Sequence, residues 1–276
     1  MITVKYPPLQ SLMDYVFKTY SELESRCTSE GNDVVIEDCV DCHSDSYYGG
    51  NTQYKCGNSK KVYLVRYMAA QIKQIDLALS QSLRQDISSQ QHLKAISLGG
   101  GPGTEIIALM DILRTYDGNF SINFDNVDSE KSWKNIFEDL THRFANKISN
   151  IELKPRFFPS DLKNYANRAK VLYDIAFVSW LFSLVDKPQE ILSILNTIKQ
   201  LLNEDGYLIV ADRFEDEVVA NISEAVGNID GLILIEHDRQ IQWCGVMFPE
   251  DIKDVFKVRL RANGAYWILQ KASELF

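Results

Sequence analysis

Four glycines lie within five residues of this chain, in the segment AISLGGGPGTE at residues 95–105. The segment is typical of a strand that ends in a tight turn, and the apolar residues 106–113 after it predict a helix. Glycines in a strand-to-helix turn let the backbone approach a ligand closely and point the first N–H groups of the helix at it. The chemistry expected of such a loop is the binding of a nucleotide-type cofactor: a dinucleotide, a nucleoside triphosphate or S-adenosylmethionine (SAM).

The spacing of the glycines separates these cofactors. A dinucleotide fingerprint needs glycines at the first, third and sixth positions, but the sixth position counted from Gly99 is Thr104, and the lysine of a Walker A loop is absent. The remaining pattern, G-x-G-x-G over Gly99, Gly101 and Gly103, resembles motif I of the class I SAM-dependent methyltransferases. The resemblance implies that this loop, which includes Gly100, lies under the methionine part of SAM. A tight turn without a ligand is the alternative.

Acidic residues follow the next two expected strands. Asp128 and Ser129, about 25 residues past the loop, match motif II of the family, which implies a side chain that accepts hydrogen bonds from both ribose hydroxyls. Asp161 and Leu162 match the place where the family commonly binds adenine, the aspartate through the amino group and the neighbouring backbone N–H through a ring nitrogen. For each aspartate the alternative is that it caps the helix that follows it, and for Asp128 the ribose role is preferred.

The fourth expected strand, within residues 173–182, resembles motif IV of the family, the strand whose end lies beside the transferred methyl. Ser179 and Trp180 occupy the place where enzymes that methylate base amines carry Asn/Asp-Pro-Pro-aromatic, and the cysteine of 5-methylcytosine enzymes is also absent there. We assign both residues to the cofactor site, with Trp180 as a core or pocket-wall aromatic. Residues 201–212 match in part the family's next turn and strand. No residue is assigned as catalytic.

The first 92 residues are expected to form an N-terminal lid of helices and loops that binds the acceptor, with helices over residues 9–24 and 62–83. In related methyltransferases a helix at the position of residues 62–83 covers the cofactor. Arg66 is then a candidate partner of the methionine carboxylate, because a guanidinium pairs bidentately with a carboxylate. A structurally paired or exposed arginine is the alternative. The tyrosine-rich residues 46–54 are a candidate wall of the acceptor pocket or a surface loop.

Four of the five cysteines, Cys27, Cys39, Cys42 and Cys56, lie within 30 residues. Cys39 and Cys42 have the spacing of a zinc knuckle, but the other two do not form a second such pair. We expect reduced cysteines without a metal, and a zinc site is the alternative.

Positioning the candidate residues requires strands that alternate with helices from residue 93 onward. Strands are expected over residues 95–98, 121–127, 156–158, 174–180, 207–211 and 232–236, and helices over 104–116, 130–148, 162–167, 188–202 and 217–229. Such alternation predicts an α/β fold with a doubly wound, mostly parallel sheet, and the resemblance implies seven strands. Residues 255–261 and 265–270, joined by Asn263-Gly264, are expected to form a C-terminal antiparallel hairpin. The expected domains are the lid, residues 1–92, and the SAM-binding domain, residues 93–276.

The composition narrows the range of partners. The 29 Lys and Arg against 38 Asp and Glu give a net charge of −9, which disfavours binding to nucleic acid by charge alone. Membrane-spanning and secretory segments are not expected, and a cytoplasmic setting is therefore expected, with a nuclear one as the alternative. The resemblance implies a SAM-dependent methyltransferase that acts on an O or N atom of an acceptor. A small-molecule acceptor is favoured, RNA or protein is the alternative, and a catalytically inactive SAM-binding partner protein is a further one.

Overall fold

The computed structural model describes residues 7–23, 39–41, 43 and 57–273. The chain divides into two compact units, Met1–Lys73 with Gln242–Ala262, and Gln74–Ile241 with Asn263–Phe276. The second unit holds every predicted cofactor residue except Arg66, which belongs to the first. No helix in the described part of the chain has the length and apolar character needed to cross a bilayer.

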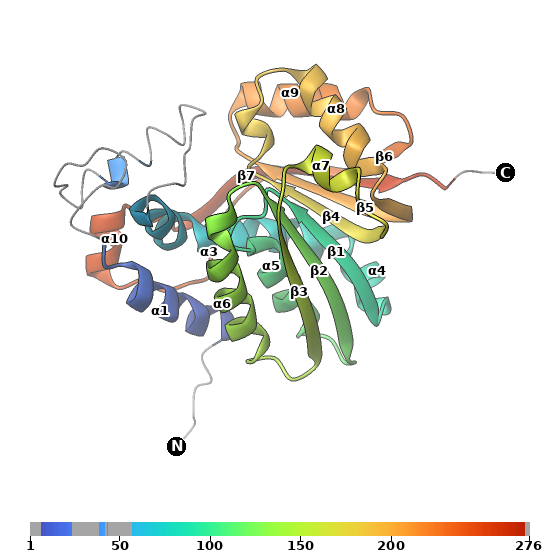
Figure 1. Ribbon diagram of the computed structural model, residues 1–276. Coiled ribbons are helices and arrows are strands. Elements are labelled where there is room, and N and C mark those ends of the chain that lie inside the picture. Colours follow the sequence, from blue (N-terminus) through green and yellow to red (C-terminus); the bar gives the residue numbers. More distant parts are fainter. Residues whose placement is uncertain (1–6, 24–38, 42, 44–56, 274–276) are drawn as a thin grey trace. The chain divides into compact units, whose positions relative to one another are not determined.

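A seven-stranded sheet lies mainly in the second unit, with the order β3-β2-β1-β4-β5-β7-β6 (Figure 1). β1 pairs in parallel with β2 and β4, β2 with β3, and β4 with β5, whereas β5 and β7 are antiparallel. The strands are β1 (His92–Leu98), β2 (Phe120–Asp128), β3 (Ile151–Pro159), β4 (Tyr173–Ser179), β5 (Leu202–Asp212), β6 (Leu232–Trp243) and β7 (Arg261–Lys271). The predicted α/β fold is confirmed, and each strand expected between residues 95 and 236 is present with shifted ends.

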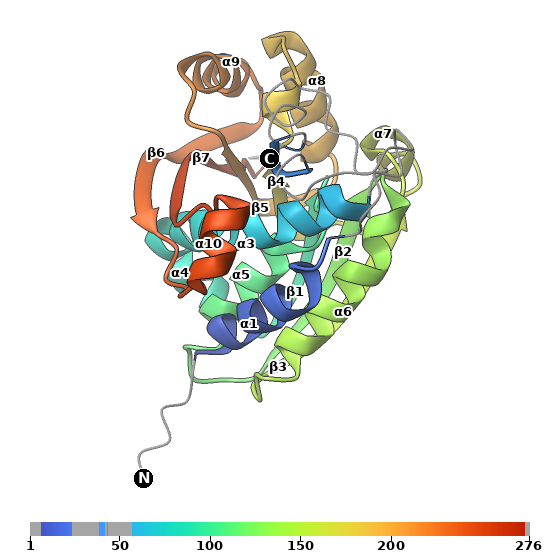
Figure 2. The same cartoon turned by 90° about the vertical axis from the view of Figure 1, so that its left-hand side faces the viewer.

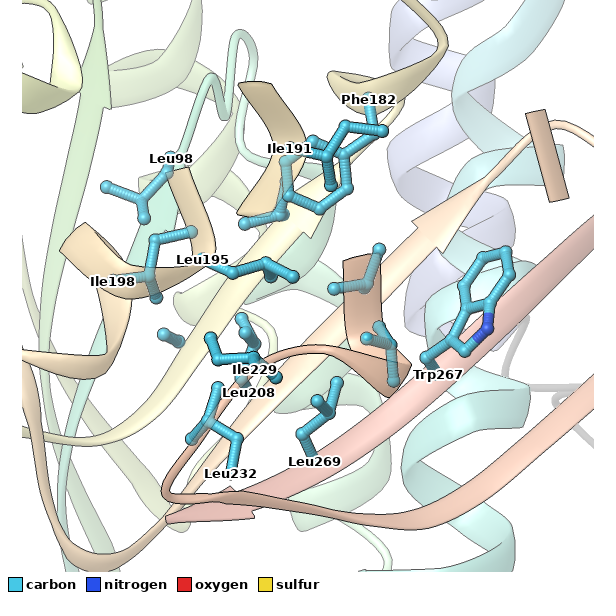
Figure 3. Close-up of a cluster of buried hydrophobic side chains, with 14 of the residues drawn as sticks. Leu98, Phe182, Ile191, Leu195, Ile198, Leu208, Ile229, Leu232, Trp267 and Leu269 are labelled. Carbon is cyan, nitrogen blue, oxygen red and sulfur yellow. The ribbon is translucent and has the colours of Figure 1, made fainter. Parts of the chain in front are cut away.

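One face of the sheet is covered by α7 (Leu162–Ala166), α8 (Pro188–Lys199) and α9 (Asp216–Gly227). α8 and α9 lie side by side in both views (Figure 1 and Figure 2). Strand residues such as Leu98 and Leu208 meet Leu195 of α8 in one buried apolar cluster, which also holds Trp267 of β7 (Figure 3). The two-residue period of the strands and the apolar stripe of the helix together produce this core.

The opposite face is covered by α5 (Thr104–Leu113) and α6 (Lys134–Ala145); α4 (Arg84–Ser89) precedes β1, and short 3-10 turns lie at Lys131–Trp133 and Phe182–Leu184. Phe137 of α6 stacks on Phe124 of β2, with ring centroids 6.2 Å apart. Because side chains alternate along a strand, Asn126 points to this same face and Asp125 points to the other.

A polar cluster centred on Asp125 lies within the face covered by α7. The buried carboxylate accepts hydrogen bonds from Arg156 on β3, with Nε–Oδ1 at 2.7 Å and Nη2–Oδ2 at 2.8 Å. It also accepts from the hydroxyls of Tyr165 on α7 and Tyr173 on β4. Burial raises the pKa of Tyr165 to about 12 and also raises the pKa of Tyr173. The cluster therefore joins three strands and a helix through one carboxylate.

The first unit contains α1 (Pro8–Tyr20), most of α3 (Gly57–Ser82) and α10 (Glu250–Phe256). Both predicted N-terminal helices are thus present. The rings of Phe17 and Phe248 pack with centroids 4.9 Å apart, and the Gln10 amide exchanges hydrogen bonds with the backbone N–H and C=O of Met247. These contacts join α1 to the segment after β6. The assignment of residues 1–92 to an acceptor-binding lid stays a prediction.

The cysteine cluster is described only in part. Cys39 is buried and accepts a hydrogen bond from the Asn58 amide at 3.4 Å. Cys27, Cys42 and Cys56 lie outside the described residues, as do the tyrosines within residues 46–54. The zinc alternative therefore stays untested.

The antiparallel C-terminal pairing is present, but its elements differ from those expected. β7 runs unbroken through Asn263 and Gly264, beside β5 and β6, and α10 occupies part of the segment predicted as the preceding strand. A Cβ at Gly264 would lie 1.9 Å from Nε2 of Gln74. That amide donates to the carbonyl oxygens of Asp212 and Ala265, each at 3.0 Å. The glycine thus serves a close approach within a strand and not a turn.

Candidate functional site

The predicted cofactor residues of the second unit follow the carboxyl ends of neighbouring strands. The registers align Leu98 with Val127 and with Val178, so β1, β2 and β4 end at the same edge of the sheet. β1 lies between β2 and β4, and successive strands proceed from it in opposite directions. Open α/β sheets bind ligands at this kind of switch point, because the loops that leave adjacent strands separate there.

The glycine loop depends on glycine in two different ways. Gly99, Gly101 and Gly103 have positive φ values of 71°, 45° and 87°, a region that residues with a Cβ adopt at a cost. At position 100 there is instead no room for a side chain, since a Cβ added to Gly100 would lie 2.3 Å from Asn126 Oδ1 and 2.4 Å from Ser97 Oγ. The loop backbone therefore lies directly on side chains from β1 and β2, and the chain then enters α5.

Asp128, at the end of β2, connects to this loop. Its Oδ2 accepts a hydrogen bond from the Gly101 N–H at 2.9 Å, and its Oδ1 accepts one from the Glu130 N–H at 2.8 Å. Burial raises the pKa of Asp128, and these two N–H donors oppose that rise. The helical turn after β2 is capped by Glu130, whose carboxylate accepts from the Ser132 N–H. Asp128 therefore braces the loop, and exposed Ser129 lies next to it.

A cluster of buried polar side chains supports the loop from below, and of its members only Ser179 was assigned to the site from the sequence. The members come from β1, α5, β2 and β4, and their residues are at most 6% exposed: Ser97, Thr104, Glu105, Asn126 and Ser179. The Asn126 amide donates to the Gly101 carbonyl at 3.0 Å, and the Thr104 hydroxyl donates to Glu105 Oε2 at 3.1 Å. Ser97 Oγ, Asn126 Oδ1 and Ser179 Oγ are buried without a hydrogen-bond partner among the described residues.

Glu105 is the titratable member of this cluster. It lies in the first turn of α5 and is 1% exposed. Burial raises the pKa of Glu105 to about 7, against its own backbone N–H and the hydroxyls of Ser179, Thr104 and Ser97, which favour the charged form. The Ser97 and Ser179 hydroxyls lower the pKa of this carboxyl, although neither forms a hydrogen bond of regular geometry with it. The sequence signal was an acid at the start of a mostly apolar helix.

The third strand is followed by a helix cap. Asp161 accepts hydrogen bonds from the backbone N–H of Asn164 at 2.8 Å and from its side-chain amide, and these bonds lower the pKa of Asp161. Leu162 is the first residue of α7 and packs on the apolar cluster. The capping alternative is thus present in the structure, and contact of Asp161 and Leu162 with adenine stays a prediction.

The end of β4 has an unusual backbone. Trp180 has φ 52°, and its N–H donates to the Ala211 carbonyl at 2.8 Å. Such a φ is uncommon for a bulky residue and costs on the order of 1–3 kcal/mol. Beside it, buried Asp212 accepts from the N–H groups of Ser183 at 3.0 Å and Arg213 at 2.7 Å, and burial raises the pKa of Asp212. The strand end adjoining Ser179 is therefore held in a defined and strained shape.

Arg66 lies on the part of α3 that belongs to the first unit. Its guanidinium lies over the Tyr67 ring at 5.1 Å from the centroid, and Nη1 reaches the Val40 carbonyl at 3.5 Å. These contacts fit the alternative of a structurally paired arginine. Its pairing with a cofactor carboxylate stays a prediction.

Comparison with known proteins gives a likeness of fold. No family model matches the chain, and no curated protein does. Among solved structures, the fibrillarin/Nop5p complex is 12% identical, with 74% of this chain and 82% of that chain covered and a TM-score of 0.44. The N-methyltransferase NodS from Bradyrhizobium japonicum WM9, in complex with S-adenosyl-L-homocysteine, is 10% identical, with coverage of 75% and 97% and a TM-score of 0.43. An rRNA methylase from Streptococcus thermophilus is 12% identical, with coverage of 69% and 94% and a TM-score of 0.40.

Proposed function

We propose that this chain is a SAM-dependent methyltransferase whose cofactor binds over the glycine loop between β1 and α5. The observation that carries the proposal is the bracing of Gly101 by Asp128 at the switch point of the sheet, where the N–H of the loop meets a carboxylate at 2.9 Å. A loop that only turned the chain would not require glycines at all of these positions together with a carboxylate and buried polar side chains beneath them.

The residues present fit this cofactor. The Cβ that Gly100 lacks would collide with Asn126 and Ser97, so the loop is packed down onto the sheet, and Gly99 at the start of the loop is exposed. Asp128 uses one acceptor position of each carboxylate oxygen for an N–H, and an ionised carboxylate has about four such positions. The remaining positions would accept from the two ribose hydroxyls. Ser179 and Trp180 would border the methyl-bearing end, beyond the loop.

Methyl transfer from SAM requires the protein mainly to place the two reactants correctly. When bound, SAM supplies a methyl group on a positively charged sulfur, and transfer to an acceptor lone pair leaves an uncharged thioether. The chain's own residues would orient the cofactor, align the acceptor near the end of β4 and exclude water. No catalytic residue is needed for an acceptor that is already nucleophilic. A small-molecule acceptor is supported by the net charge of −9.

The test of the proposal is calorimetric titration of the intact protein with SAM. We expect saturable binding at one site per chain, with weaker binding for Asp128→Asn, which keeps the size of the side chain but offers fewer acceptor positions. Gly227→Ala is the control, because a Cβ at Gly227 meets nothing within 4 Å. Absence of SAM binding by the wild-type protein would overturn the proposal.

The acceptor class requires a second measurement. If the acceptor is RNA, affinity should fall steeply with salt, because neutralised phosphates release counterions. We expect no salt-dependent RNA binding, and methyl transfer from labelled SAM to a small-molecule fraction of a cell extract. RNA binding with a steep salt dependence would favour the RNA alternative. Binding of SAM without transfer to any fraction would favour a catalytically inactive partner protein.

A further inference from the structure

Glu105 places a carboxyl group directly beneath the proposed cofactor loop. It comes two residues after Gly103 and is 1% exposed, so water does not solvate its charge. The supporting hydroxyls come from two strands, Ser97 on β1 and Ser179 on β4, and from Thr104 at the start of the same helix. The carboxyl therefore lies between the glycine loop and the end of β4, the two places that the proposed function gives to the methionine part and the transferred methyl.

Among the described residues no cation pairs with this carboxyl; it accepts a hydrogen bond from the Thr104 hydroxyl, and its own N–H and the hydroxyls of Ser97 and Ser179 favour its charged form. Of the other acids at this edge, Asp128 on β2 is bound to two N–H groups and Asp212 on β5 to two others. Asp125, also on β2, points to the opposite face, where Arg156 pairs with it. A buried carboxylate without a paired cation costs free energy, and a ligand cation held nearby would lower that cost.

We propose that the Glu105 carboxylate lets this site distinguish a sulfonium cofactor from its uncharged thioether product. The inference rests on the proposed function, since it assigns a role to one residue toward that ligand. SAM and S-adenosylhomocysteine share the adenosine and amino-acid parts, so loop and ribose contacts hold them equally. They differ in a methyl group and in one positive charge at sulfur. An anion under the loop favours the charged form, because opposite charges attract strongly in a poorly hydrated site. Glu105 thus acts on binding and product release as a positioning residue, without touching the reacting atoms.

The proton on Glu105 should control this preference. Burial raises the pKa of Glu105 to about 7, so the carboxyl is neutral in mild acid and charged in mild base. The affinity ratio, Kd of S-adenosylhomocysteine over Kd of SAM, should therefore rise with pH through that region. The Ser179 hydroxyl favours the charged form. Its removal in Ser179→Ala should move the midpoint of the rise to higher pH.

The experiment measures both dissociation constants by calorimetry between pH 5.5 and 8.5, on wild-type protein and on Glu105→Gln. The wild-type ratio should rise by about threefold to tenfold, the range expected for one charge in such a site. In Glu105→Gln the ratio should stay near the value that the wild-type protein has at low pH. Protonation of groups on the two ligands affects both proteins alike, so it cancels when the two pH courses are compared. Glu138→Gln is the control, because Glu138 lies on α6 with its side chain 43% exposed and pairs with Lys134, so its loss should leave the rise intact.

The outcomes separate the two proposals. If neither ligand binds the wild-type protein, the proposed function fails. If both bind and the wild-type ratio follows the same course with pH as in Glu105→Gln, the cofactor assignment stands and the role of Glu105 is overturned. Should Glu105→Gln not fold, the wild-type course and the midpoint in Ser179→Ala decide: a flat ratio, or an unmoved midpoint, overturns the role of Glu105.

Discussion

Replacing Glu105 by glutamine removes a buried ionisable group while it keeps the size of the side chain. Burial raises the pKa of Glu105 from its ordinary value of 4.5 to about 7 in the folded protein. The unfolded chain therefore loses this proton near pH 4.5 and the folded chain near pH 7. Between these values the folded state binds more protons than the unfolded state, so the free energy of unfolding falls as the pH rises.

The size of the effect follows from the two pKa values. One pKa unit corresponds to about 1.4 kcal/mol, so ionisation of Glu105 should lower the free energy of unfolding by about 2.5 kcal/mol between pH 5 and pH 8. The side chain is 1% exposed, so solvent screening does not reduce this figure. The stabilisation is complete below about pH 4.5 and is lost as the pH passes about 7.

The assay is urea unfolding of wild-type protein and of Glu105→Gln at pH values from 5 to 8. All other groups titrate in both proteins, so they cancel in the difference between the two curves. Between pH 5 and pH 8 the difference should shift by about 2.5 kcal/mol in favour of Glu105→Gln. Curves that stay parallel within about 0.5 kcal/mol across this range would refute the burial argument.

Three further changes test the packing of the site and of the sheet. Gly100→Ala should weaken SAM binding by more than about tenfold in calorimetry, because its Cβ would displace Asn126, whereas unchanged affinity would show a loop free of that contact. Gly264→Ala should lower the free energy of urea unfolding by about 1–3 kcal/mol, and the added change Gln74→Ala should recover part of this loss; strictly additive losses would contradict the contact. Asp125→Asn should cost about 2–4 kcal/mol in the same assay and leave the SAM affinity of the folded protein within about twofold.

The glycine loop could be predicted because its residues have consequences within the local backbone. Three positive φ values and one close approach leave few residue types other than glycine at these positions. The alternation of strands and helices was likewise visible as apolar periods. Asp128 was found by its place after a strand, but its bond to Gly101 joins residues 27 apart and appears only when β1 and β2 pair.

Glu105 and the C-terminal strands show what local patterns do not contain. An acid in the first turn of a helix is ordinary, because it favours the helix dipole and is usually solvated. Only the packing of α5 against the sheet removes it from water. Similarly, Asn263-Gly264 is a strong hairpin signal, yet β7 runs through both residues, and Gln74, distant in sequence, occupies the space beside Gly264 and donates to the Ala265 carbonyl. In both places a tertiary contact overrides a local preference.

β2 shows how one strand serves two purposes through its two-residue period. Asp125 faces α7 and joins β2, β3 and β4 through Arg156, Tyr165 and Tyr173. The next residue, Asn126, faces α5 and holds the Gly101 carbonyl at 3.0 Å. A polar network that stabilises the sheet and one that shapes the loop are thus separated by the thickness of the sheet. For this reason a change at Asp125 should act on stability and a change under the loop on binding, although the two positions are adjacent in the chain.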